Sequence, residues 1–145
     1  MAINNNTLSV DVFNTVMTVL VANKPKVTNT TTHKTKTASI AVAYNDKKVD
    51  APQIVLYAPQ ISESGYRFGE SQGKKSITVV VECYYDNALG ANQLSDSVTA
   101  TIKEAIDNQT ITGVDLIAIE KEVAITDPSQ IKFQLTSVAF IFDRE

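Results

Sequence analysis

Cysteine, histidine and tryptophan are nearly absent from this chain: its 145 residues include one cysteine, Cys83, one histidine, His33, and no tryptophan. A lone cysteine excludes an internal disulfide, and one Cys with one His falls short of the roughly three or four ligands that a zinc site takes. A serine or cysteine nucleophile needs a base, and His33 lies in a tract with no acid to orient it. We therefore expect no metal, no cofactor and no catalytic residue, and the chain is predicted not to be an enzyme.

Long apolar runs and an excess of basic residues are also missing. No stretch approaches the roughly 18 apolar residues of a membrane span, and the opening MAINNNTLSV has neither the basic stretch nor the apolar core of a signal peptide. Lys and Arg number 13 against 16 Asp and Glu, for a net charge of −3, which does not favour a nucleic-acid backbone as the main partner. We expect a protein made in a cytoplasm, with no membrane contact and no specific DNA binding.

The chain does have enough apolar residues for a core. Hydrophobic residues make up 43% and charged residues 20%, and the length fits one domain, 1–145. Helical spacing of apolar residues and strand-like patterns alternate along the chain, with helices expected at 8–23 and 93–109 and strands at 38–46, 52–60, 76–87, 112–126 and 131–145. The segment 61–75 holds three of the five glycines and is expected to be a loop or hairpin tip. This order predicts an α+β fold, a mostly antiparallel sheet with two helices packed against it.

Two strands carry more specific predictions. In 76–87 both alternating sets of residues are largely apolar near the middle, so this strand is expected to be central and covered on each face. Within this strand Cys83 is expected to be a small buried hydrophobe. In 131–145 the apolar residues change phase, and a bulge near Thr136 and Ser137 is expected to bring both sets to one side.

The stretch TNTTTHKTKT, residues 28–37, has the most unusual composition in the chain. From Lys24 to Lys36 there are four lysines and no acid, a local charge of +4, so the rest of the chain carries −7 for a total of −3. A basic arm at about 25–37 on an acidic body is suited to docking on an acidic patch, and on another copy this gives a head-to-tail contact. Two other interpretations are open: a solvated loop, and one side of a hairpin whose other side is 38–44.

A family resemblance covers most of the chain. It rests on the opening helix FNTVMTVLVAN, on the strand, polar turn and helix of KKSITVVVECYYDNALGANQLSDSVTATIKEAIDN, and on the closing strands GVDLIAIEKEVAI and IKFQLTSVAFIFDRE. This order of elements resembles the tail terminator proteins of long-tailed bacteriophages, whose terminal strand is apolar and then charged, as in VAFIFDRE. The resemblance rests on pattern, and the threonine tract is not part of it.

The resemblance implies a structural virion protein at the tail–head junction, assembled in the host cytoplasm. Such proteins form a six-membered ring on the last ring of tail-tube protein, end tube polymerisation and provide the head-joining surface. The expected partners are therefore further copies of this chain in a hexamer ring, the tail-tube protein and a head-completion protein, while DNA passes through without specific binding.

Candidate contact residues follow from charge and from side-chain type. For the subunit interface of the ring, the candidates are Lys24, Lys26, His33, Lys34 and Lys36. Aromatic and arginine side chains are common anchors of interfaces, so the candidates for the tube or head contact are Tyr66, Arg67 and Phe68. For these three, a loop packed on its own domain is the structural alternative.

Other functions are compatible with the same pattern. One is a tail-tube or other neck or connector protein of the same particle, which polymerises rather than caps and is expected to be richer in strands. Another is a small cellular binding module, which is expected to be a well-defined monomer.

Overall fold

The computed structural model describes residues 7–29, 32–42, 52–64, 74–85, 88–124 and 134–144. In chain order its elements are α1 (Leu8–Asn23), β1 (Lys26–Thr28), β2 (Thr35–Thr37), β3 (Ser39–Val42), β4 (Gln53–Leu56), β5 (Gln60–Ser64), β6 (Lys74–Tyr85), α2 (Ala88–Asp107), β7 (Val114–Ala124) and β8 (Gln134–Arg144). With two helices and mostly antiparallel strands, the observed fold is α+β, and the predicted fold class is confirmed.

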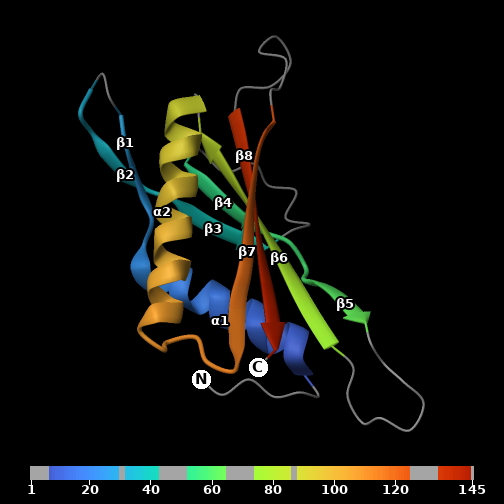
Figure 1. The fold of residues 1–145 in the computed structure, drawn as a ribbon. Helices are drawn as coiled ribbons and strands as arrows, with labels where there is room; N and C mark the ends of the chain where they lie inside the picture. Colours follow the sequence, from blue (N-terminus) through green and yellow to red (C-terminus); the bar gives the residue numbers. More distant parts are fainter. Residues whose placement is uncertain are drawn as a thin grey trace, which may run out of the picture.

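The strands form two separate sheets (Figure 1). The six-stranded sheet has the order β3-β4-β6-β8-β7, and β5 pairs with β6 beside this path. Every pair is antiparallel except β3 with β4, and the two closing strands, β7 and β8, pair with each other. The two-stranded sheet of β1 and β2 lies beside α2, on the side away from β7 and β8.

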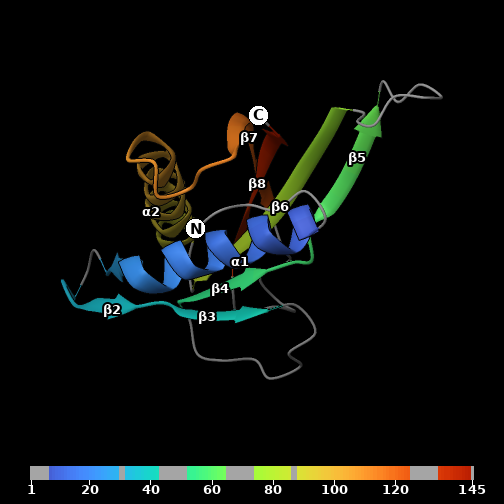
Figure 2. The ribbon, with the colours of Figure 1, turned by 90° about the horizontal axis from the view of Figure 1, so that it is seen from below.

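The core lies between the two helices and one face of the six-stranded sheet. Each helix buries a stripe at the helical spacing of roughly three or four residues. The fully buried members of these stripes are Val12, Val16, Leu20, Leu94, Val98 and Ile102. The sheet adds alternate residues of its central strands, also without exposed surface: Ile54, Leu56, Ile77, Val79, Val81, Cys83, Val138, Phe140 and Phe142. Figure 2 shows α1 lying crosswise to α2.

β6 is central in the sheet, as predicted, but only one of its faces is fully covered. Thr78, Val80, Glu82 and Tyr84 point to the second face and are half-buried. No helix among the described residues packs on this second face, which we call the open face. The prediction of cover on each face is therefore not met, because these four side chains keep contact with solvent.

The predicted bulge near Thr136 and Ser137 is wrong, since β8 pairs with β6 from end to end without a register shift. Thr136 is buried in phase with the core residues of β8, and its hydroxyl donates to Asn92 Oδ1 of α2 at 2.8 Å. The register shift lies instead in β7, between Leu116 and Ala118. Leu135 therefore lies on the open face rather than in the core, and Ile131 and Phe133 lie outside the described residues.

The start of α2 depends on a close contact. The helix begins at Ala88, ahead of the predicted start at 93, and Gly90 lies within its first turn. A Cβ at Gly90 would lie 1.9 Å from Tyr85 Cδ1, which is closer than two carbon atoms can approach. This glycine therefore serves helix packing on the end of β6 rather than a turn.

Candidate functional site

The threonine tract forms most of a β-hairpin, which we call the hairpin arm. In it β1 and β2 pair antiparallel, with Lys26 opposite Thr37 and Thr28 opposite Thr35. The two hydroxyl oxygens of Thr28 and Thr35 are 2.9 Å apart, within hydrogen-bond distance. The described residues of the tract therefore belong to a hairpin rather than to a solvated loop.

One part of the hairpin hypothesis needs correction. The second strand is not 38–44, because residues 39–42 form β3 in the six-stranded sheet and pair with β4. The tract instead folds back on the residues that precede it, 26–28. Threonine favours strand conformation, and the tract pairs with the short strand β1, of which only Thr28 belongs to the tract.

The base of the hairpin arm is fixed to the rest of the protein. Val27 is 1% exposed, so its side chain belongs to the core. The main-chain N–H of Thr28 donates to Gln93 Oε1 of α2 at 3.2 Å, and the N–H of Ala38 donates to the carbonyl of Pro25 at 2.8 Å. All three residues of β2, in contrast, are exposed. The arm therefore stands beside α2 in a defined direction (Figure 1).

The lone histidine has a main-chain role in the turn of the arm. His33 has a positive φ of 56°, a conformation in which histidine is enriched among non-glycine residues. Its N–H donates to the carbonyl of Asn29 at 2.8 Å, and the N–H of Asn29 donates to the carbonyl of Lys34 at 2.8 Å. The side chain of Asn29 accepts a further bond, from the N–H of Thr32 at 3.1 Å.

The structure brings the predicted interface residues together and leaves them exposed. They lie in the hairpin arm or directly before it: Lys24, Lys26, His33, Lys34 and Lys36. Lys24 ends α1 with a left-handed φ of 50°, and its N–H donates to the Leu20 carbonyl at 3.1 Å. The predicted tube or head contacts, Tyr66, Arg67 and Phe68, lie outside the described residues.

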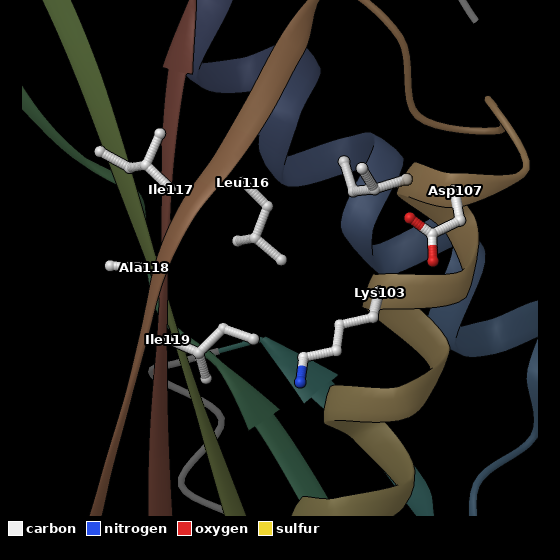
Figure 3. A pocket seen from close by; sticks show the side chains of 7 residues that line it. Lys103, Asp107, Leu116, Ile117, Ala118 and Ile119 are labelled. Carbon is white, nitrogen blue, oxygen red and sulfur yellow. The ribbon is translucent and has the colours of Figure 1, made fainter.

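A groove runs between α2 and β7 (Figure 3). Its volume is about 390 Å³, and it is lined by Lys103, Ile106 and Asp107 of α2 and by residues 116–119 of β7. Figure 3 shows Leu116 and Ile119 directed from β7 toward α2, with Lys103 extending toward them, while Ile117 and Ala118 point away. The sequence contains no signal for the groove, because it does not reveal that β7 is an edge strand.

The open face of the six-stranded sheet is acidic. By the strand register, Asp115 lies opposite Asp143, and Glu122 lies opposite Ser137, which in turn lies opposite Glu82. Glu120 is in the same phase as Glu122, and both are exposed. The basic side chains that the structure describes in this sheet are in the other phase: Lys75, Lys121 and Arg144. Lys121 pairs with Asp96 of α2, with Nζ and Oδ1 2.7 Å apart.

Three ionisable side chains of the sheet have shifted pKa values. Tyr57 and Tyr84 both donate to Glu82 Oε2 on the open face, at 2.7 and 2.5 Å. Burial, followed by the hydrogen bond to Glu82 and the charge of that carboxylate, raises the pKa of both phenols. Burial also raises the pKa of the Cys83 thiol from 9.0 to about 12. These shifts keep the phenols and the thiol protonated, the opposite direction to that which would make a base or a nucleophile.

Within the described ranges, no group of three or more His, Cys, Asp or Glu residues is arranged to hold a metal ion. None of the helices described here combines the length and apolar character needed to cross a bilayer. Neither the known protein families nor the curated proteins include one that matches this sequence.

Proposed function

We propose that this chain is a structural virion protein that forms a ring on the end of a phage tail tube, ends tube polymerisation and provides the head-joining surface. The proposal joins the resemblance of the element order to the hairpin arm, and the arm is the observation that carries it. An anchored, exposed strand pair with lysines and no acid is built for contact with another protein surface rather than for the stability of its own core.

Charge separation supports contact between copies of the chain. The arm carries three lysines and Lys24 lies two residues before it, while the described acids lie on the sheet and on the helices. A positive arm and a negative body on one chain are complementary between two molecules, and two different patches in contact generate a ring when the rotation closes. The acidic open face is suited to the channel of such a ring, because it would repel passing DNA.

The helix content favours a cap over a tube subunit as the form of assembly. A tube protein is expected to be richer in strands, and here α1 and α2 span 16 and 20 residues. The alternative of a monomeric binding module predicts no self-association. Microscopy of the purified protein therefore distinguishes a monomeric module from a ring-forming cap.

Negative-stain microscopy of the purified protein, alone and mixed with tail tubes, tests the proposal. We expect rings seated at one end of the tubes. Monomers that leave tube ends bare would contradict it, and continuous growth of the chain into tubes would support the tube-subunit alternative instead.

A triple variant of the arm, Lys26→Ser/Lys34→Ser/Lys36→Ser, tests whether the charge of the arm is needed for ring assembly. In this variant the hairpin keeps Val27 and its threonine pairs but loses most of its positive charge. Rings should become fewer while the circular dichroism spectrum stays unchanged. A change of spectrum would show that the arm is needed for the fold, and the three lysines would then have to be tested singly.

A further inference from the structure

The outer side of α1 has a second row of residues, which the core does not use. The buried stripe of this helix includes Val12, Val16 and Leu20. At 3.6 residues per turn, the opposite side of the helix is formed by Val10, Asn14, Met17 and Val21. Val10 and Val21 are 55% and 49% exposed, Asn14 is also exposed, and Met17 is half-buried. We call these four residues the outer stripe.

The spacing of the outer stripe is typical of a contact between two helices. Its members follow one another after four, three and four residues, the spacing at which the side chains of one helix pack into a second helix. At about 1.5 Å per residue, the row from Val10 to Val21 is about 16 Å long. Single exposed apolar residues are ordinary, whereas apolar residues aligned along one side of a helix mark an interaction surface.

The charges of α1 limit what can cover the outer stripe. Asp11 is the one charged residue of the helix, and it lies beside the stripe, where its carboxylate accepts a hydrogen bond from the Thr7 hydroxyl at 2.9 Å. A helix that rests on a membrane surface typically has lysines and arginines on its polar face, and α1 has neither. The stripe itself has no charge that would select a basic or an acidic partner. It therefore fits an apolar, uncharged helix.

Asn14 selects a second copy of α1 as that helix. A side-chain amide donates and accepts hydrogen bonds, so a covered Asn14 needs a partner group that does both. In a parallel pair of α1 helices Asn14 meets Asn14, whereas in an antiparallel pair it would meet Met17 and remain without a partner. The other described helix, α2, does not fit the stripe, because its exposed positions include charged side chains: Asp96, Lys103, Glu104 and Asp107.

We propose that the outer stripe of α1 pairs in parallel with the outer stripe of a second copy, around a two-fold axis that brings the two Asn14 side chains together. The same surface is used on both copies, so the contact closes at two. It goes beyond the proposed function and does not involve the hairpin arm. A contact of this length belongs to the class below about 1,200 Å² of total buried surface, in which association is weak. We expect a dissociation constant of about 100 μM.

Insertion of a charge tests the contact. Val21→Lys should raise the dissociation constant of self-association at least about tenfold, because the pair would bring two ammonium groups together. Sedimentation velocity over a concentration series up to about 1 mM measures it. Leu89→Lys is the matched control, because it also places a lysine at an exposed apolar position, 73% exposed, but on α2. The control should pair like the wild type, and both variants should keep the circular dichroism spectrum.

A disulfide tests the parallel arrangement. In Val21→Cys the two new thiols are neighbours in a parallel pair, within the Cα separation of roughly 4.4–6.8 Å that a disulfide needs. In an antiparallel pair residue 21 meets residue 10, and the thiols are about 16 Å apart. Cys83 is buried and should not cross-link. Mild oxidation followed by non-reducing electrophoresis should give a covalent dimer of Val21→Cys but not of Leu89→Cys, whose thiol is exposed outside the stripe.

The outcomes separate this contact from the proposed function. Weaker pairing in Val21→Lys together with cross-linking of Val21→Cys supports the contact. A wild-type chain that is monomeric at about 1 mM, unchanged pairing in Val21→Lys, or pairing without the cross-link overturns it. The triple arm variant Lys26→Ser/Lys34→Ser/Lys36→Ser should keep the α1 pair, and loss of the dimer in that variant would assign self-association to the arm instead. Rings that persist on tube ends in Val21→Lys leave the proposed cap intact.

Discussion

The six-stranded sheet and the hairpin arm are both built mainly from antiparallel strands, yet they are stabilised in different ways. In the sheet, alternate side chains of β6 and β8 are apolar and have no exposed surface. In the arm, Val27 is the one residue of the two strands that is buried, and the other contacts are hydrogen bonds within the hairpin and to Gln93. Isolated two-stranded hairpins are marginally stable in water, so the arm depends on its base and on local turn geometry. The sheet maintains the fold, while the arm is available for contacts outside it.

The largest expected difference between the sheet and the arm is in the rate at which a thiol group reacts. Cys83 is buried with its pKa raised to about 12, so only a trace of thiolate exists near pH 8. In the variant Cys83→Ala/Thr35→Cys the single thiol lies in the exposed arm, with an ordinary pKa. Its reaction with Ellman's reagent should be at least about a thousandfold faster than that of Cys83. Similar rates would show that the sheet opens as readily as the arm.

Truncation of a core aromatic side chain should have the next largest effect. Phe140→Ala leaves a cavity on the covered face and should lower the free energy of unfolding by about 3–5 kcal/mol. Lys36→Ala in the arm should change it by less than about 0.5 kcal/mol. Urea unfolding followed by circular dichroism measures both, and equal losses would remove the distinction between the regions.

Truncation of Val27, which anchors the arm, should lower the free energy of unfolding by an amount between the effects of Phe140→Ala and Lys36→Ala. Val27→Ala removes two buried methyl groups and should lower stability by about 1–3 kcal/mol. Hydrogen exchange of the arm amides should accelerate more than exchange in β6, because the loss is at the base of the hairpin. Thr37→Val, at an exposed position of β2, serves as the control and should leave both quantities near their wild-type values.

The buried thiol also predicts a dependence of stability on pH. The folded pKa of Cys83 is about 12, above its ordinary value of 9.0, so the folded state binds the proton more tightly than the unfolded state does. Stability from this group is complete below about pH 9 and falls as the pH rises from 9 toward 12, by at most about 1.4 kcal/mol per unit. Urea unfolding between pH 8 and about 10 measures the slope. The slope should be smaller in Cys83→Ala, and an equal slope would exclude the thiol as its source.

The smallest effect is expected at the turn of the arm. His33 adopts a positive φ, which a side chain with a Cβ disfavours. His33→Gly should therefore raise stability by up to about 1 kcal/mol, while His33→Val, β-branched, should lower it by a similar amount. Thermal unfolding of the two variants compares them, and an opposite order would mean that the imidazole ring itself supports the turn.

The sequence predicted the elements whose periodicity is regular and missed those that depend on distant contacts. The limits of α1 and the buried stripe of α2 follow from apolar spacing, and both agree with the structure. The first turn of α2 was missed because Gly90 signals a turn locally, while its reason, the ring of Tyr85, lies on another element. The bulge was wrongly predicted because Leu135 is apolar yet lies on the open face, and an apolar pattern alone does not tell which face of a strand is covered.

In the candidate site, too, the sequence predicted the local features and missed those that depend on distant contacts. Composition alone identified the lysines of the arm, since a local charge of +4 is visible in the sequence. It did not identify the strand that pairs with the tract, because threonine-rich β2 is compatible with either neighbour. The groove depends on β7 being last in the sheet, and strand order is a property of the whole topology.

The route by which the chain leaves the arm has a mechanical consequence. β2 continues through Ala38 directly into β3, which lies parallel to β4 with Ser39 to Val42 in register (Figure 2). A load on the arm along this line would shear β3 against β4, so the hydrogen bonds between them would share the force instead of breaking one after another. Tension applied at the tip of the arm would therefore be transmitted to the six-stranded sheet through all the β3–β4 hydrogen bonds at once, rather than by separating these bonds one at a time from one end.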